Sequence, residues 1–226
     1  MSPRVVALVP ARNEADRLGA TVSALRALRE VDEVVVVDDG SVDGTASVAL
    51  ARGAAVLRTG RRTGKGGALE GGLRRLPPAD AWLFADADLG ESAGVLSAVL
   101  EPVLLGQADL AIAVFPEGEG GGGLGTVKSS AARAIRLLCG FRTVEPLSGQ
   151  RALTSAALEA VRPLARGFGV ESAMTVDAVR AGMRVVEVPA AASHRGTGRD
   201  ARGFAHRGRQ AVEIALALIP RALGLR

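Results

Sequence analysis

The sequence predicts an α/β protein built on a Rossmann-like, mostly parallel β-sheet flanked by helices. Short apolar runs, of which 5–9 and 34–37 are the first two, are typical of strands that are buried on both faces. Segments with a helical spacing of apolar residues follow these runs, and this alternation repeats along the chain. Ligands bind beyond the carboxyl ends of the strands in such sheets, so we expect the functional residues there.

In the first half, strands are expected at 5–9, 34–37, 55–57 and 81–85, and helices at 13–28, 45–51 and 68–76. Asn13 is expected to cap the first helix and Asp43 or Ser41 the second, because short polar side chains accept hydrogen bonds from free N–H groups at a helix start. Pro77 and Pro78 are expected to break the chain after the third helix.

In the second half, helices are expected at 93–100, 127–139, 155–161 and 172–180, and strands at 110–115 and 184–188. Six glycines in 117–125 predict a flexible loop. No internal repeat and no clear linker divide the chain.

The charge of the chain is uneven. The formal net charge is +4, but residues 193–226 hold seven arginines against Asp200 and Glu213, so this segment carries +5 and residues 1–192 carry −1. We expect the basic segment to face an anionic ligand or to form a solvated rim. Aromatic residues make up 3% of the chain and Tyr is absent, which argues against the stacking platforms of single-stranded nucleic-acid binders.

Other features of the composition bear on the cellular location. No uncharged run exceeds nine residues (92–100), whereas a membrane-spanning helix needs about 20 apolar residues. The first residues lack a secretory cleavage pattern, and the single cysteine, Cys139, excludes an internal disulfide. These observations predict a cytoplasmic protein.

Three polar motifs follow the first predicted strands. Residues 10–14 (Pro-Ala-Arg-Asn-Glu) place free backbone N–H groups near a ligand's oxygens, although a plain helix cap explains them equally well. Residues 38–41 (Asp-Asp-Gly-Ser) offer a carboxylate to a ribose or a base, or form a simple turn. Residues 63–68 (Thr-Gly-Lys-Gly-Gly-Ala) open a helix with Lys65, one of only two lysines, which favours a phosphate contact over a surface turn.

Asp86 and Asp88 follow the predicted strand 81–85. Side chains at i and i+2 of an extended segment point the same way, so these carboxylates would bridge a hard divalent cation and its waters. Without a cation the two carboxylates would repel each other. We therefore expect a metal site here.

The order of these four motifs along the first 120 residues or so resembles glycosyltransferase family 2, whose members have the GT-A fold. The resemblance implies transfer of a hexose from a nucleotide-diphosphate sugar, of UDP-glucose or GDP-mannose type, with Mg²⁺ or Mn²⁺ on the Asp-x-Asp motif. It assigns the nucleoside to Pro10, Ala11, Glu14 and Asp39, the phosphates to Lys65, and the sugar and metal to Asp86 and Asp88.

Two subfamilies are similar to different parts of the chain. Residues 86–89 and the 148–152 loop resemble polyprenyl-phosphate sugar transferases of the dolichyl-phosphate mannose synthase type, which implies acceptor contacts at Ser148, Gly149 and Arg151. Gly90 departs from that subfamily, which usually has Gln there. Residues 64–66, 169–171 and His194 resemble glucosyl-3-phosphoglycerate synthases, in which a carboxyl-terminal His completes the metal site. The resemblance thus implies a phosphate-bearing acceptor, such as polyprenyl phosphate or 3-phosphoglycerate.

The later polar segments complete the expected site. His194 would be the third metal ligand, and Arg195 and Arg199 would stabilise the leaving diphosphate. Glu171 and Asp86 are the expected catalytic residues; Glu171 would contact the acceptor, or act as general base if a sugar hydroxyl attacks, whereas a phosphate acceptor needs no base. The inverting or retaining outcome stays open. The segments 117–125 and 195–202 are the expected lids.

We expect a single domain over residues 1–226. Residues 1–115 would bind the nucleotide sugar, residues 116–203 would bind the acceptor and carry the lids, and residues 204–226 would form a carboxyl-terminal helix. The apolar stripe of this helix consists of Ala211, Val212, Ile214, Ala215, Leu216, Leu218 and Ile219. We favour packing of the stripe on the body or on the second subunit of a homodimer over docking on anionic lipid at the inner face of the membrane. Arg207, Arg209 and Glu213 would lie outside the stripe, and Pro220 would kink or end the helix.

Two other function classes share some of these features. A sugar-1-phosphate nucleotidyltransferase should have a glycine-rich loop after the first strand, where this chain has residues 10–14. A non-catalytic nucleotide-sugar-binding protein would need no intact metal site. Because Lys65, Asp86, Asp88 and His194 are all present, the sequence favours a catalyst.

Overall fold

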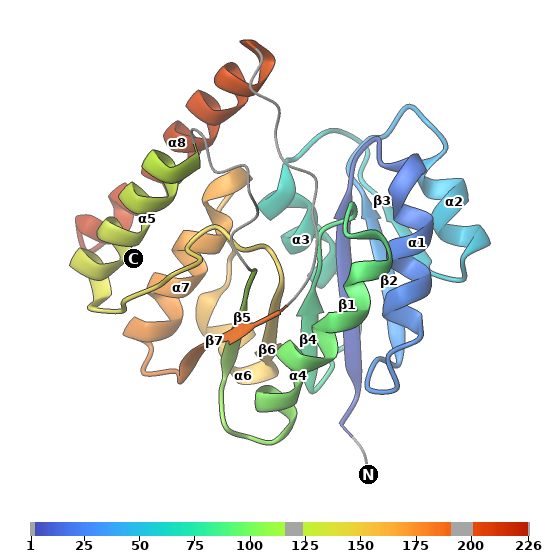
Figure 1. Cartoon of the computed structure of the whole chain (residues 1–226), viewed down its shortest axis with the longest axis horizontal. Helices are drawn as coiled ribbons and strands as arrows, with labels where there is room; N and C mark the ends of the chain where they lie inside the picture. The colour runs from blue at the N-terminus through green and yellow to red at the C-terminus, as the bar shows by residue number, and fades with distance from the viewer. Residues whose placement is uncertain (1–2, 116–123, 191–200, 226) are drawn as a thin grey trace.

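The computed structural model describes residues 3–115, 124–190 and 201–225 (Figure 1). In these residues seven strands form one mixed sheet in the order β3-β2-β1-β4-β6-β5-β7. The strands are β1 (Val5–Ala11), β2 (Glu33–Asp38), β3 (Ala55–Arg58), β4 (Ala81–Phe84), β5 (Leu110–Val114), β6 (Arg151–Thr154) and β7 (Val185–Pro189). Strand β6 runs antiparallel to β4 and β5, and the other pairings are parallel.

Helices cover both faces of this sheet. They are α1 (Ala15–Arg26), α2 (Thr45–Ala51), α3 (Lys65–Leu73), α4 (Ser97–Leu104), α5 (Leu124–Cys139), α6 (Ser155–Val161), α7 (Val170–Arg180) and α8 (Ala201–Ala222). Two 3₁₀ turns, η1 (Gly90–Leu96) and η2 (Gly167–Gly169), precede α4 and α7. The predicted α/β class with a mostly parallel, helix-flanked sheet is confirmed.

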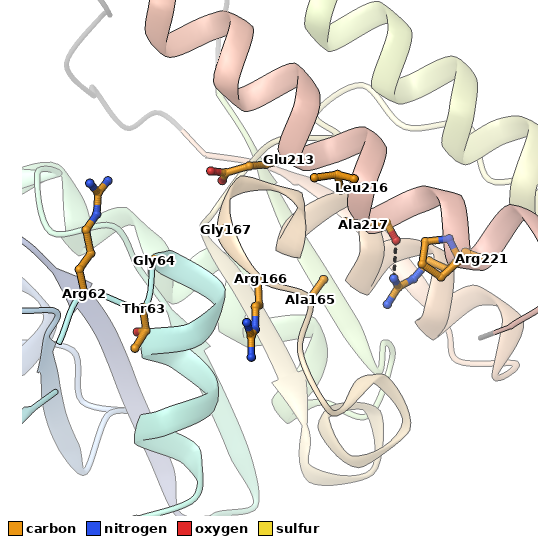
Figure 2. Close-up of a pocket in the computed structure, with 11 residues that line it drawn as sticks. Arg62, Thr63, Gly64, Ala165, Arg166, Gly167, Glu213, Leu216, Ala217 and Arg221 are labelled. Atoms are coloured by element: carbon orange, nitrogen blue, oxygen red, sulfur yellow. Dashed lines mark hydrogen bonds between the residues drawn. The ribbon is translucent and has the colours of Figure 1, made fainter. Parts of the chain in front are cut away.

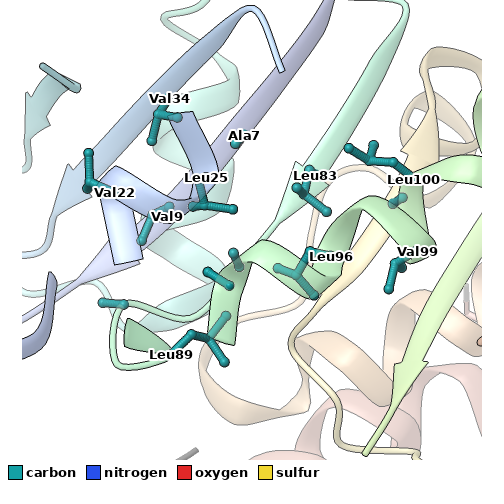
Figure 3. Close-up of a cluster of buried hydrophobic side chains, with 14 of the residues drawn as sticks. Ala7, Val9, Val22, Leu25, Val34, Leu83, Leu89, Leu96, Val99 and Leu100 are labelled. Atoms are coloured by element: carbon teal, nitrogen blue, oxygen red, sulfur yellow. The ribbon is translucent and has the colours of Figure 1, made fainter. Parts of the chain in front are cut away.

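The sheet separates two apolar cores. Along β1, Val5, Ala7 and Val9 face one core, and Val6 and Leu8 face the other, as the two-residue period of a strand requires. The first core is closed by side chains of α1, η1 and α4, which Figure 3 shows packed against β1, β2 and β4. Burial on both faces explains why these strands appear in the sequence as continuous apolar runs.

The caps of the first two helices differ from the prediction. Helix α1 begins after Glu14, and Asn13 has a left-handed backbone (φ 55°) with its Oδ1 accepting from Val42 N at 3.0 Å. Helix α2 begins after Gly44, and Ser41 Oγ accepts from Asn13 N at 3.0 Å. Asn13 and Ser41 thus bond across between the two helix starts. Asp43 does contact the start of its own helix as predicted, because its Oδ1 accepts from Thr45 N at 3.0 Å, and its Oδ2 accepts from Ala15 N of α1 at 3.3 Å.

The boundaries of two other helices also differ from the predicted ranges. Helix α3 begins at Lys65 and ends at Leu73, earlier at both ends than the expected range. Helix α5 begins at Leu124, within the expected glycine-rich loop, and the rest of that loop, 117–123, lies outside the described residues.

Only part of the predicted apolar stripe of α8 is buried, and the rest is exposed to solvent. Ile214 and Leu218 are buried against Ala131 and Ile135 of α5 and Val176 of α7, which confirms packing on the body for this part of the stripe. Leu216, by contrast, is 64% exposed. Glu213, which was expected outside, points inwards, and its Oε2 accepts from Phe168 N at 2.9 Å.

Pro220 lies inside the last turn of α8, and the helix ends two residues later. Within the described ranges, no helix has the length and apolarity that crossing a membrane requires.

Candidate active site

The carboxyl ends of β1, β2 and β4 meet at one edge of the sheet, because these strands are parallel neighbours. Residues 10–14, 38–41 and 86–88, which are far apart in the sequence, are therefore brought to the same edge. Helix α3 approaches this edge through its first residue, Lys65. This is the place where ligands bind in sheets of this type.

Lys65 joins two carboxylates from different elements. Its Nζ lies 2.5 Å from Asp86 Oδ1, after β4, and 2.7 Å from Glu171 Oε1, in the first turn of α7. Burial alone would lower the pKa of Lys65, but the two negative charges outweigh burial and raise its pKa above the usual value. Lys65 is therefore a permanent cation between Asp86 and Glu171.

Gly149 and Gln150 cover this ion-pair cluster. Gln150 is buried, and its Nε2 donates to Asp86 Oδ2 at 2.7 Å. A Cβ on Gly149 would lie 2.2 Å from Lys65 Nζ and 2.7 Å from Asp86 Oδ2, so only glycine lets the backbone pass so close. Sequence reasoning missed Gln150, and its place between Gly149 and Arg151 was the only available signal.

Arg151 lies in strand β6, which corrects the expected loop. Its side chain is 1% exposed, and Nε donates to Ser148 O at 2.8 Å while Nη1 donates to Thr175 Oγ1 at 2.9 Å. Among the described residues, Nη2 has no hydrogen-bond partner. Burial lowers the pKa of Arg151 to about 10, and the negative charge of Glu171 opposes this shift. The guanidinium thus lies beneath the site, covered by protein, and Ser148 is buried as well.

Asp39 organises the turn that leads into Lys65. Its carboxylate accepts four hydrogen bonds, from Thr59 Oγ1, from the N and Oγ1 of Thr63, and from Gly64 N, at 2.7 to 3.1 Å. A carboxylate has about four acceptor positions, so these four hydrogen bonds occupy all of them. Any nucleoside contact made by Asp39 has to share these positions with the turn.

The other predicted nucleoside residues lie on the neighbouring strand end. Pro10 and Ala11 close β1, beside Val37 and Asp38 of β2. Glu14 is half-buried at the start of α1, where its backbone N donates to Thr45 Oγ1 at 2.9 Å. The edge thus brings Pro10, Ala11 and Glu14 together with Asp39.

Ala87 and Asp88 form a turn directly after Asp86, where an extended chain was expected. Thr21, buried in α1, anchors it: Thr21 Oγ1 donates to Ala87 O and accepts from Gly90 N, both at 2.8 Å. The two carboxylates are therefore not related by the two-residue period of a strand. Thr21 is a second residue that sequence reasoning missed, since it belongs to the apolar pattern of α1.

No group of three or more His, Cys, Asp or Glu side chains that could hold a metal ion occurs among the residues with described positions. The expected third ligand, His194, lies outside them, as do Arg195 and Arg199. Asp86 and Asp88 supply carboxylate oxygens, which suit a hard divalent cation.

A cavity of about 490 Å³ lies beside the start of α3. Figure 2 shows Arg62, Thr63 and Gly64 on its α3 side and Glu213, Leu216 and Ala217 on its α8 side. The walls approach each other closely at two glycines, because a Cβ on Gly66 would lie 1.9 Å from Ala165 O, and one on Gly169 would lie 2.4 Å from the Cβ of Ala217. Helix α8 is thereby packed against the segment that leads into Glu171.

Comparison with known proteins gives one family match. Residues 6–154 match the model described as Glycosyl transferase family 2. The chain is 31% identical over 193 residues to a glucosyl-3-phosphoglycerate synthase of Mycolicibacterium paratuberculosis, covering 75% of this chain and 58% of that protein. It is 30% identical over 205 residues to an undecaprenyl-phosphate mannosyltransferase of Micrococcus luteus, covering 82% of each.

Solved structures agree with this match. Glucosyl-3-phosphoglycerate synthase from Mycobacterium tuberculosis, in complex with Mg²⁺ and UDP, superposes with a TM-score of 0.83 at 27% identity, over 97% of this chain and 79% of that one. The same enzyme with Mn²⁺, UDP and glucosyl-3-phosphoglycerate gives a TM-score of 0.82 at 26% identity, over 97% and 80%.

Proposed function

Because the chain belongs to glycosyltransferase family 2 and is therefore a glycosyltransferase, we propose that it moves a hexose from a nucleotide-diphosphate sugar to a phosphate-bearing acceptor, with Mg²⁺ or Mn²⁺ as cofactor. The observation that carries the proposal is the cluster in which Lys65 joins Asp86 and Glu171 at the carboxyl edge of the sheet. The cluster combines a cation for a diphosphate with carboxylates for a sugar and a metal. Family membership sets aside the nucleotidyltransferase and non-catalytic alternatives.

The donor lies along the strand ends in this proposal. Pro10, Ala11 and Glu14 contact the nucleoside, together with Asp39, and the diphosphate reaches towards Lys65. A UDP-sugar is the first candidate, since the similar mycobacterial structures hold UDP, and a GDP-sugar is the alternative. Support for this placement comes from the shared edge. The backbone N–H groups of Asn13, Glu14 and Ala15, which were expected to be free for a ligand, donate instead to side chains at the start of α2.

The proposed metal ligands are Asp86, Asp88 and His194. When bound, a divalent cation stabilises the negative charge that grows on the leaving diphosphate. Lys65 adds a positive charge that its two carboxylates keep permanent, and Arg195 and Arg199 are proposed to contribute further positive charge.

Glu171 is proposed to orient the acceptor, together with Gly149 and Ser148. If the acceptor is a phosphate, its oxygen is already ionised near neutral pH and Glu171 need not act as a base. We assign Arg151 a positioning role, because it bonds Thr175, and Thr175 Oγ1 in turn donates to Glu171 O at 3.1 Å.

A single domain with two halves is proposed as well. Its support is the β4–β6 pairing, which joins the strand before Asp86 to the strand that starts at Arg151 within one sheet.

The test is release of nucleoside diphosphate from UDP-glucose and GDP-mannose, with Mn²⁺ or Mg²⁺, in the presence of 3-phosphoglycerate or polyprenyl phosphate. We expect release with one donor, loss of release in excess chelator, and a severe loss in Lys65→Met. The matched control is Lys128→Met, the other lysine, whose ion pair is with Glu145 and not with Asp86 or Glu171. Absence of release with every donor, together with unchanged donor binding by Asp88→Ala, would contradict the proposal.

A further inference from the structure

Helix α8 presents an apolar surface to solvent. From residue 211 to 223 every exposed residue is apolar, and these residues form what we call the α8 outer face: Ala211, Val212, Ala215, Leu216, Ile219, Ala222 and Leu223. The charged residues of this stretch point the other way. Glu213 accepts from Phe168 N, and Arg221 forms a buried ion pair with Asp177.

This arrangement reverses that of an ordinary surface helix, in which charged residues face water. Val212, Leu216 and Ile219 are 50 to 64% exposed, and no other part of the described chain covers them. The face continues into an apolar groove of about 490 Å³ between α8 and α5, which Ile219 and Leu137 both line. Figure 1 shows these two helices side by side at one end of the molecule. A continuous apolar surface of this kind marks an interaction site.

Charge identifies the partner of this surface. Residues 201–210, the first half of α8, contain three arginines and no acidic residue. A helix that combines an apolar face with a basic segment is suited to the interface of an anionic membrane. A second copy of the chain would bring two basic segments of equal charge together, which opposes association.

The α8 outer face also reaches the cavity beside α3, which Thr63 and Gly64 line directly before Lys65. Leu216 belongs both to this face and to the wall of the cavity beside α3. Arg62 and Arg166 line the same cavity and make no ion pair or hydrogen bond within the described ranges. A phosphate carried on an apolar chain would find Arg62 and Arg166 in the cavity and an apolar path along α8. The carboxylate of Glu213 lines the cavity as well, and it accepts a hydrogen bond from Phe168 N.

We propose that the α8 outer face docks on an anionic membrane surface and that the acceptor is a lipid phosphate entering the cavity from that membrane. The second half of this proposal rests on the proposed glycosyl transfer. Docking itself does not, since it follows from the exposed face and the basic segment.

Docking is tested by co-sedimentation of the full chain with vesicles of phosphatidylglycerol and phosphatidylcholine, and with vesicles of phosphatidylcholine alone. The test variant is Leu216→Glu with Ile219→Glu. The matched control is Leu50→Glu with Leu105→Glu, at positions in α2 and directly after α4 that are 60% and 61% exposed. We expect wild type and control to bind the anionic vesicles, and the test variant to bind at least about tenfold more weakly. Circular dichroism checks that both variants are folded.

Equal binding by wild type and the test variant, or absence of wild-type binding, would overturn docking. A stable dimer in sedimentation equilibrium that the test variant abolishes would also overturn it, because the face would then be a protein interface.

The acceptor is tested with Arg62→Gln combined with Arg166→Gln. We expect at least about a tenfold rise in the KM for polyprenyl phosphate in vesicles and an unchanged affinity for the donor. An unchanged KM would overturn the lipid-phosphate pocket.

Two further outcomes separate docking from glycosyl transfer. Release of nucleoside diphosphate with a soluble phosphate acceptor, but no binding to vesicles, would refute docking while glycosyl transfer stands. Vesicle binding without release from any donor would refute glycosyl transfer while docking stands.

Discussion

Replacing Gly149 by alanine probes the ion-pair cluster without removing any of its charges. The new Cβ would lie 2.2 Å from Lys65 Nζ and 2.7 Å from Asp86 Oδ2. Ordinary contact begins at 3.4 Å, so Nζ has to retreat by about 1 Å. Nζ is the end of a flexible side chain, so this movement costs little stability, and we expect the free energy of unfolding to change by less than about 1 kcal/mol.

The same displacement should be costly for catalysis. Lys65 can no longer hold Asp86 and Glu171 at 2.5 and 2.7 Å, and a misplacement of about 1 Å in a reacting group lowers the rate on the order of 100-fold. We therefore expect Gly149→Ala to lower kcat/KM by about that factor, measured as nucleoside diphosphate release. Thermal and urea unfolding should show an almost unchanged stability.

The matched control is Gly71→Ala, in the helix that Lys65 begins. A Cβ on Gly71 meets nothing within 4 Å, and alanine favours a helix by about 1 kcal/mol, so activity should be retained. Wild-type activity in Gly149→Ala, or an equal loss of activity in Gly71→Ala, would show that the backbone above Lys65 does not constrain the cluster.

Three further changes test the packing and charge of the fold. Gly66→Ala should destabilise the protein by about 3 kcal/mol or more in urea unfolding, since the new Cβ would lie 1.9 Å from the backbone oxygen of Ala165; a loss below about 1 kcal/mol would contradict this contact. Arg221→Met should cost about 3–5 kcal/mol because it leaves the buried Asp177 carboxylate without its partner, and adding Asp177→Asn should recover part of that loss. Burial raises the pKa of Glu70, but hydrogen bonds from two arginines and a backbone N–H outweigh burial and lower it. Its contribution to stability is therefore present above about pH 4.3 and is lost as the pH falls through the lowered pKa, so the stability gap between wild type and Glu70→Gln should shrink in acid; a constant gap would refute the assignment.

Part of the candidate site was predictable because its residues belong to short motifs at strand ends. Lys65, Asp86 and Glu171 were each identified from their neighbours in the sequence, and the structure brings the three together. Their mutual pairing was not predicted, since it depends on how α3 and α7 approach the strand after which Asp86 lies. Gln150 was missed because an isolated glutamine carries no chemical signature.

Sequence patterns alone predicted the α/β class, the alternation of elements and the edge at which the functional residues lie. Apolar periodicity and strand-end motifs are local properties of the chain, so they are readable without coordinates. Three features were visible only in the folded protein: Arg151 lies beneath the site, Asp39 holds the turn before Lys65, and α8 presents apolar side chains to solvent. These facts depend on contacts between residues far apart in the chain, where burial and hydrogen-bond geometry choose among roles that the same residue type can play.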